Sequence, residues 1–356
     1  MRPQHVNHSL LFREMFMAQF SELSSLLSHD PDTPDLQPLL SDHLASLLQY
    51  TVPGGKMNRG LSVPHTLSLL KPGASARELE LASVLGWTVE MLQAFFLVAD
   101  DIMDGSITRR GQPCWYKRGD IGMAAFNDSL ILETCVYSVI RKYFRAEPYY
   151  LHLLENMLEV TKFTTYGQSL DTISAANFTK VRGQAGSLEP FTMERYTAIV
   201  KYKTSFYSFY LPVVFAMNMA GYSDKMMYRQ AREILLEIGH YFQVTDDYLD
   251  CFGDPEVIGK IGTDIQDGKC SWLIVKALEI ASEEEKMILT QHYGRHDEED
   301  ISIIKQLYQK LQIQQQFRDY ESKFYQSVVS KIDGVSDEFP KEVFTTFLDK
   351  VYKRNM

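Results

Sequence analysis

Cysteine is scarce in this 356-residue sequence, which contains only Cys114, Cys135, Cys251 and Cys270. They lie far apart, no two have C-x-x-C spacing, and the nine histidines do not cluster with them. A disulfide framework and a zinc site are both disfavoured. The sequence therefore predicts a reduced intracellular protein.

A surplus of positive charge is also missing, because the formal net charge is −10. Proteins that bind nucleic acids normally carry excess Lys and Arg to meet the phosphates, so this function class is disfavoured. An anionic substrate is still compatible, since a few local cations can face it.

Long apolar runs are absent as well, since none reaches the ~18 residues of a membrane-spanning helix, and no transmembrane segment is expected. The first eight residues lack the apolar region of a secretory signal, and Glu14 and Glu22 disfavour a mitochondrial presequence. We expect a cytoplasmic protein. A targeting segment removed ahead of residue 1 stays open as an alternative.

Alternating patterns typical of strands are scarce, whereas apolar residues recur at three- and four-residue steps, as in 11–23 and 301–325. Two stretches, 78–104 and 234–250, are apolar on most sides, as expected for helices buried in a large bundle. No linker, low-complexity run or repeat divides the chain. The sequence predicts a single all-α domain over residues 1–356.

Two aspartate-rich runs of the form D-D-x-x-D lie at 100–104 and 246–250, each at the end of an apolar stretch. On a helix, positions i, i+1 and i+4 fall close to one face. Three carboxylates on one face repel one another unless divalent cations hold them together. Two such faces meeting across a cavity would bind several cations and a polyanion, which points to diphosphate chemistry.

Cationic residues lie close to the first run and upstream of it. Arg109 and Arg110 follow that run, and guanidinium groups offer paired donors to phosphate oxygens. Residues 54–60, GGKMNRG, combine glycines with Lys56 and Arg59 as a phosphate-binding loop does, without Walker A spacing. Taken singly, each feature has a plain alternative: an acidic helix end neutralised by arginines, or an ordinary surface loop.

Five segments carry a resemblance to a known family, in its order and spacing: 54–60, 95–116, 166–171, 201–210 and 242–272. They closely resemble the eukaryotic farnesyl diphosphate synthases, from about residue 50 to the C-terminal region. The resemblance implies an all-α isoprenoid synthase (prenyltransferase) fold, a helical bundle around a deep central cavity, and a homodimer.

The resemblance also implies the reaction. The family joins isopentenyl diphosphate head to tail with dimethylallyl diphosphate and then with geranyl diphosphate, through ionisation of the allylic diphosphate. We therefore expect a prenyltransferase that makes the C15 farnesyl diphosphate with three Mg²⁺ ions per active site.

Roles for individual residues follow from the same resemblance. The implied metal-binding residues are Asp100, Asp101, Asp104, Asp171, Asp246, Asp247 and Asp250, among which Asp247 and Asp250 support Asp246. The allylic diphosphate would be held by Arg109, Lys203 and Lys260, and isopentenyl diphosphate by Lys56, Arg59, Gln93, Arg110 and Arg354. Gln168 and Lys269 complete the substrate-binding set. The implied catalytic residues, which would stabilise the allylic cation, are Lys203, Thr204, Tyr207 and Gln243.

Product length can be read from the first run. Phe96 lies four residues before Asp100, on the same helix face and one turn of about 5.4 Å away, which is close to the reach of one isoprene unit. With its neighbour Phe95 it is expected to form the floor of the pocket for the growing tail. The alternative is two ordinary core phenylalanines.

Gly105, His240 and Thr245 depart from the pattern of the family. Thr245 precedes the second run where a glutamine is common, and its smaller side chain could loosen the pocket near the allylic group. This suggests a relaxed substrate choice that accepts ethyl-branched homologues. Neutral drift at a tolerant position is the alternative.

Other functions stay open at this point. A related enzyme could make geranyl diphosphate or ethyl-branched prenyl diphosphates, or could cyclise one allylic diphosphate as a terpene synthase does. A terpene synthase needs no second substrate, so the presence of the isopentenyl diphosphate residues favours chain elongation. A non-catalytic prenyl-binding paralogue would tolerate loss of the metal aspartates, yet all six are present in the two runs.

Overall fold

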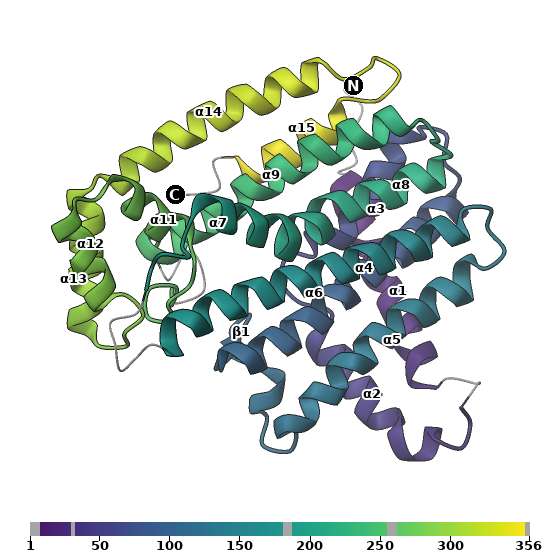
Figure 1. Ribbon diagram of the computed structural model, residues 1–356. Coiled ribbons are helices and arrows are strands. Elements are labelled where there is room, and N and C mark those ends of the chain that lie inside the picture. Colours follow the sequence, from purple (N-terminus) through teal and green to yellow (C-terminus); the bar gives the residue numbers. More distant parts are fainter. Residues whose placement is uncertain (1–7, 30–32, 181–186, 255–261, 353–356) are drawn as a thin grey trace, which may run out of the picture. The chain divides into compact units, whose positions relative to one another are not determined.

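A computed structural model describes residues 8–29, 33–180, 187–254 and 262–352, with the backbone alone for 8–11 and 176–180. Helices dominate these residues (Figure 1), so the predicted all-α fold is confirmed. A short antiparallel hairpin of β1 (Thr108–Arg109) and β2 (Gln112–Pro113) was not predicted.

The chain divides into two compact units. Unit 1 comprises Met1–Thr161 and Tyr210–Tyr228, and unit 2 comprises Lys162–Phe209 and Arg229–Met356. The prediction of a single domain stays a prediction.

Unit 1 is built around one long buried helix, α4 (Ala76–Asp104). It also contains α1 (His8–Ser28), α2 (Gln37–Thr51), α3 (Asn58–Leu70), the hairpin, η1 (Trp115–Lys117), η2 (Gly122–Ala124), α5 (Ala125–Phe144), the first part of α6 (Tyr150–Lys180) and α8 (Leu211–Ala220). The helix α4 packs against α1, α3, α5 and α8, which explains why its sequence is apolar on most sides.

Two local signals in the sequence set the ends of α4. Ser75 and Glu78 form a reciprocal capping box that satisfies backbone N–H groups at its start. Gly105 ends the helix with a φ of 69°, a left-handed conformation that glycine adopts without steric cost. The helix therefore stops directly after the first aspartate run.

The middle of α4 is fixed by aromatic packing. The buried Trp87 stacks on Phe16 of α1 with ring centroids 4.2 Å apart. Its indole Nε1–H donates a hydrogen bond of 2.7 Å to the Phe16 backbone oxygen. Burial of two aromatic rings stabilises this contact, and the indole donor is satisfied, so the register of α1 against α4 is specified.

Unit 2 contains the second part of α6, α7 (Met193–Ile199), the π-helical segment η3 (Val200–Tyr210) and most of α9 (Lys225–Phe252). It also contains α11 (Trp272–Ile280), α12 (Glu283–His292), α13 (Glu298–Lys310), α14 (Ile313–Asp333) and α15 (Glu342–Val351). In its core, Tyr248 of α9 stacks on Phe317 of α14 at 4.1 Å, and Trp272 meets Phe317 edge-on. These contacts hold the helix that carries the second aspartate run.

Two segments, Ala76–Asp104 and Gly122–Phe144, are long and apolar enough to cross a membrane by length and composition. This is weak evidence, because core helices pass the same test and 78% of the apolar window in the first segment is buried inside the protein. The expected absence of a transmembrane segment stays a prediction.

Candidate active site

The first aspartate run occupies the last turn of α4 in unit 1. Asp101 is buried, Asp100 is half-buried and Asp104 is exposed. Three side chains of one chemical type therefore meet three different environments, and only Asp100 and Asp104 have substantial access to solvent.

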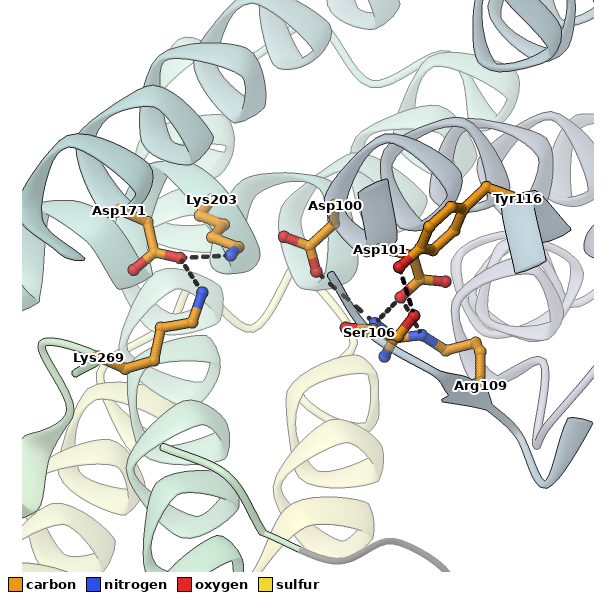
Figure 2. A network of polar contacts seen from close by, with 8 residues as sticks. All are labelled: Asp100, Asp101, Ser106, Arg109, Tyr116, Asp171, Lys203 and Lys269. Carbon is orange, nitrogen blue, oxygen red and sulfur yellow. Dashed lines mark hydrogen bonds and ion pairs between the residues drawn. The ribbon is translucent and has the colours of Figure 1, made fainter. Parts of the chain in front are cut away.

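Arg109 of the hairpin binds this run (Figure 2). Its Nε and Nη2 atoms donate to Asp101 Oδ1 at 3.1 and 2.5 Å, and Nη2 lies 3.7 Å from Asp100 Oδ2. Burial disfavours the charged guanidinium, but the hydrogen bond and charges of Asp101 and Asp100 outweigh it and raise the pKa of Arg109. Arg109 is thus a permanent cation held next to the aspartates.

A pocket of about 180 Å³ lies in unit 1 beside Arg109. Its lining includes Gly54, Gly55, Asp101, Arg109 and Arg110. Arg110 donates from Nη1 to the Thr51 backbone oxygen at 3.2 Å and covers Gly54, where a Cβ atom would lie 2.4 Å from that Nη1. A side chain at position 54 would therefore push the Arg110 guanidinium away from its present place, whereas glycine lets it approach the backbone closely.

Three other residues predicted to bind isopentenyl diphosphate are described: Lys56 lies in the loop before α3, Arg59 in α3 and Gln93 in α4. Lys56 is exposed, and Arg59 and Gln93 are half-buried. The backbone at Met57 and at Arg110 is left-handed, with φ of 49° and 54°. Such conformations cost about 1–3 kcal/mol each in non-glycine residues, and they gather at ligand-binding sites.

Phe95 and Phe96 lie half-buried on α4, with ring centroids 4.5 Å apart and ring planes at 40°. The structure therefore places two contacting aromatic rings one turn before the aspartate run. Their role in setting product length stays a prediction.

In unit 2, a buried carboxylate bridges two lysines (Figure 2). Lys203 Nζ and Lys269 Nζ lie 2.6 and 3.4 Å from Asp171 Oδ2, and Asp171 is 6% exposed. Burial acts to raise the pKa of Asp171, but the two ammonium groups outweigh it and hold that pKa below its usual value of 3.8. Asp171 was predicted to bind metal. In this structure its carboxylate pairs with Lys203 and Lys269, two of the predicted substrate-binding residues, and its role as a metal ligand stays a prediction.

Three of the predicted catalytic residues, Lys203, Thr204 and Tyr207, lie on the π-helical segment η3, and the fourth, Gln243, lies on α9. Thr204 Oγ1 donates to Gln243 Oε1 at 3.2 Å, and Gln243 Nε2 donates to Asp247 Oδ1 at 3.0 Å. The segment packs tightly on α6, since a Cβ at Gly167 would lie 2.1 Å from the Lys203 nitrogen. Gln168 and Tyr207 are both buried. Wide helical turns of this kind are frequent at functional sites.

The second aspartate run forms one turn of α9. Asp247 is buried, while Asp246 and Asp250 are half-buried. Burial, with a contribution from the charge of Asp246, raises the pKa of Asp247 to about 7, against the hydrogen bonds from Gln243 and the Trp272 N–H. Asp250 Oδ2 accepts a hydrogen bond of 3.1 Å from the Asp264 N–H.

The aspartates of the two runs offer the oxygen donors that Mg²⁺ prefers. Among the residues described here, no three His, Cys, Asp or Glu side chains converge closely enough to bind a metal by themselves. Mg²⁺ is usually held by one or two carboxylates together with waters and substrate phosphates, so such convergence is not needed. The more accessible Asp100, Asp104 and Asp246 supply hard oxygen donors of the right kind.

Two predicted ligands, Lys260 and Arg354, lie outside the described residues. Sequence reasoning missed Glu90, Asp264 and the Trp272 backbone as contributors to the site. Glu90 could have been noticed, because it is a lone acidic residue in the apolar middle of the 78–104 stretch.

Comparisons with known proteins identify the family of this chain. The family model "Polyprenyl synthetase" matches residues 41–311. The farnesyl pyrophosphate synthase of Gallus gallus is 47% identical and covers 96% of this chain and 92% of its own length. That of Saccharomyces cerevisiae is 45% identical and covers 96% of this chain and 97% of its own length.

Solved structures are similar over the same extent. The T. brucei farnesyl diphosphate synthase complexed with risedronate is 36% identical with a TM-score of 0.87, and it covers 97% of this chain and 100% of that one. The same T. brucei enzyme complexed with the bisphosphonate BPH-722 has a TM-score of 0.88.

Proposed function

The chain belongs to the polyprenyl synthetase family, and we propose that this prenyltransferase makes farnesyl diphosphate. It joins isopentenyl diphosphate head to tail, first with dimethylallyl diphosphate and then with geranyl diphosphate. The observation that carries this assignment is the pocket lined by Gly54, Gly55 and Arg110 beside the Arg109–Asp101 pair. It supplies a cationic subsite for a second substrate, which a terpene synthase does not need.

Each unit contains cationic side chains that would bind a substrate diphosphate. In unit 1, Arg109 supplies a fixed guanidinium, and Lys56, Arg59, Gln93 and Arg110 are assigned to isopentenyl diphosphate. In unit 2, Lys203 is assigned to the allylic diphosphate and Lys269 to the substrate-binding set, and Asp171 pairs with both ammonium groups. Cations placed in advance stabilise the negative charge that develops on the departing diphosphate without having to reorganise.

When bound, three Mg²⁺ ions would neutralise diphosphate charge, two held by Asp100, Asp101 and Asp104 and one by Asp246 with support from Asp247 and Asp250. Thr204 and Tyr207 are buried and Gln243 is half-buried, and such burial would help to keep away the water that quenches an allylic cation. Their oxygen dipoles, with that of the Lys203 backbone carbonyl, would stabilise the cation. The released diphosphate would then remove the proton, so no histidine base is required.

We also propose a cytoplasmic homodimer. In unit 1, Met123 of η2 and Phe126 and Leu130 of α5 expose large apolar side chains, and Phe126 is 62% exposed. They are spaced three and four residues apart, and exposed apolar residues that share a helix face can mark an interaction surface. Light scattering of the purified protein tests the dimer, and fractionation of cells that express it tests the compartment.

One incubation tests the function. Purified protein with Mg²⁺, isopentenyl diphosphate and either dimethylallyl or geranyl diphosphate should yield a fifteen-carbon product, identified by chromatography after dephosphorylation. A product that stops at ten carbons, or a cyclised hydrocarbon formed without isopentenyl diphosphate, would show that the assignment is wrong.

A further inference from the structure

The helix α4 buries an acidic side chain, Glu90, in the middle of its apolar stretch. Glu90 is only 1% exposed. A carboxylate buried this completely is costly unless it is hydrogen-bonded or paired. Its Oε1 atom accepts a hydrogen bond of 2.7 Å from the Gly60 backbone N–H, and Arg59 and Arg110 both act on it electrostatically.

Gly60 is the third residue of α3, so its N–H is one of those that a helix cannot satisfy internally. The residue before the helix, Met57, is left-handed and makes no side-chain capping hydrogen bond. Glu90 therefore does from a neighbouring helix what a capping side chain normally does from the chain itself. Burial raises the pKa of Glu90, whereas the hydrogen bond from the Gly60 N–H and the charges of Arg59 and Arg110 favour its charged form. That form would suit the positive end of the α3 dipole.

The backbones of α3 and α4 are too close at Gly60 to admit a side chain there. A Cβ atom at Gly60 would lie 2.8 Å from the Gly86 oxygen and 2.8 Å from Glu90 Cγ. The α3 N-terminus is thus pressed onto the α4 segment 86–90, with Glu90 at one end of the contact. Lys56 directly precedes Met57 and Arg59 is the second residue of α3, so the same short stretch of backbone places both cations.

We propose that Glu90 is a positioning residue for isopentenyl diphosphate: by capping α3 from α4, it holds Lys56 and Arg59 where they bind that diphosphate. This inference rests on the proposed function. A loop ordered before binding does not have to be ordered by the substrate, which strengthens the apparent affinity.

An electrostatic role and a positioning role of Glu90 predict opposite changes in KM for isopentenyl diphosphate when its side chain is altered. A negative charge close to Arg59 and Arg110 should by itself weaken the binding of an anion. If Glu90 acts only through its charge, then removing that charge should lower KM for isopentenyl diphosphate. If Glu90 acts by holding the loop, then removing it should raise that KM.

The experiment compares the full-length wild type with Glu90→Gln, Glu90→Ala and a matched control, Thr88→Val. Thr88 is equally buried on α4, and its hydroxyl donates only to the Leu85 oxygen of the same helix. We measure kcat and KM with Mg²⁺, isopentenyl diphosphate and geranyl diphosphate, and thermal unfolding by circular dichroism.

Glu90→Gln should raise KM for isopentenyl diphosphate about fivefold, which corresponds to one weakened hydrogen bond of about 1 kcal/mol. Glu90→Ala should raise it further. KM for geranyl diphosphate should stay within about twofold, and Thr88→Val should change neither KM.

An unchanged or lower KM for isopentenyl diphosphate in Glu90→Gln would overturn the inference. A parallel rise for both substrates would overturn it too, because a general loss of structure would explain it. If Glu90→Ala does not fold, Glu90→Gln alone decides. If the wild type makes no fifteen-carbon product, both the proposed function and this inference are refuted. If the wild type is active and Glu90→Gln leaves KM for isopentenyl diphosphate unchanged, the inference alone is refuted.

Discussion

The sharpest test of the packing beneath the site is Gly86→Ala on α4. A Cβ atom at Gly86 would lie 2.3 Å from the Gly60 oxygen and 2.9 Å from the Phe16 ring. The nearer obstacle is backbone, so α3 has to move away by about 0.7 Å before the contact reaches the shortest tolerable distance of 3.0 Å. Overpacking costs about 1–3 kcal/mol, and an unyielding backbone puts this case near 3.

An opposing effect reduces that cost. Alanine is about 1 kcal/mol more favourable than glycine in a helix interior. We therefore expect Gly86→Ala to lower the free energy of unfolding by about 2 kcal/mol. For a cooperative unit of this size, that corresponds to a fall in Tm of about 4–8 °C. KM for isopentenyl diphosphate should also rise, since the displaced α3 carries Arg59.

The assay is urea unfolding followed by circular dichroism, with Gly73→Ala as the control. A Cβ atom at Gly73 would meet nothing within 4 Å, so alanine there should be neutral or slightly stabilising. If Gly86→Ala proves as stable as Gly73→Ala, the close approach of α3 and α4 is not as tight as described, and the reasoning fails.

Three further predictions concern single positions. Phe95→Ala with Phe96→Ser should open the pocket floor and lengthen the product beyond fifteen carbons, and an unchanged product by chromatography would refute the floor assignment. Thr245 is 3% exposed, and its hydroxyl donates a hydrogen bond to the Tyr241 backbone oxygen of the same helix. Thr245→Gln should shift the ratio of kcat/KM between dimethylallyl diphosphate and its ethyl homologue. An unchanged ratio would count against relaxed selectivity. Burial lowers the pKa of His240 from 6.5 to about 4, so the native state resists protonation and stability is lost as pH falls from 6.5 toward 4. His240→Gln should remove about 3 kcal/mol of that loss in urea unfolding, and identical pH profiles for variant and wild type would contradict it.

Much of the helical framework could be read from the sequence, because apolar periodicity and local capping signals act within a few residues. The end of α4 is an example, since Gly105 follows the last aspartate and adopts the left-handed conformation that stops a helix. The motif residues near Asp100 and Asp246 were equally readable, because their meaning lies in local spacing. The family resemblance added the roles that spacing alone does not give.

Structural features that depend on contacts between residues far apart in the chain could not be predicted from the sequence. The π-helical segment η3 packs tightly against Gly167, which precedes Lys203 by 36 residues in the sequence. The link from Asp171 to Lys203 and Lys269 joins three segments that no local pattern connects. Hydrogen bonds between remote residues are decided by tertiary packing, which overrides local propensity.

Asp246 and Asp247 show how much the structure adds to a motif. In the sequence they are adjacent, identical residues, and spacing cannot rank them. In the structure, both oxygens of Asp247 are engaged, Oδ1 by Gln243 and Oδ2 by the Trp272 N–H. Burial raises the pKa of Asp247 to about 7, so its charged form is disfavoured. The half-buried Asp246 is therefore the better cation ligand of the pair, and Asp247 orients Gln243, which in turn accepts the Thr204 hydroxyl.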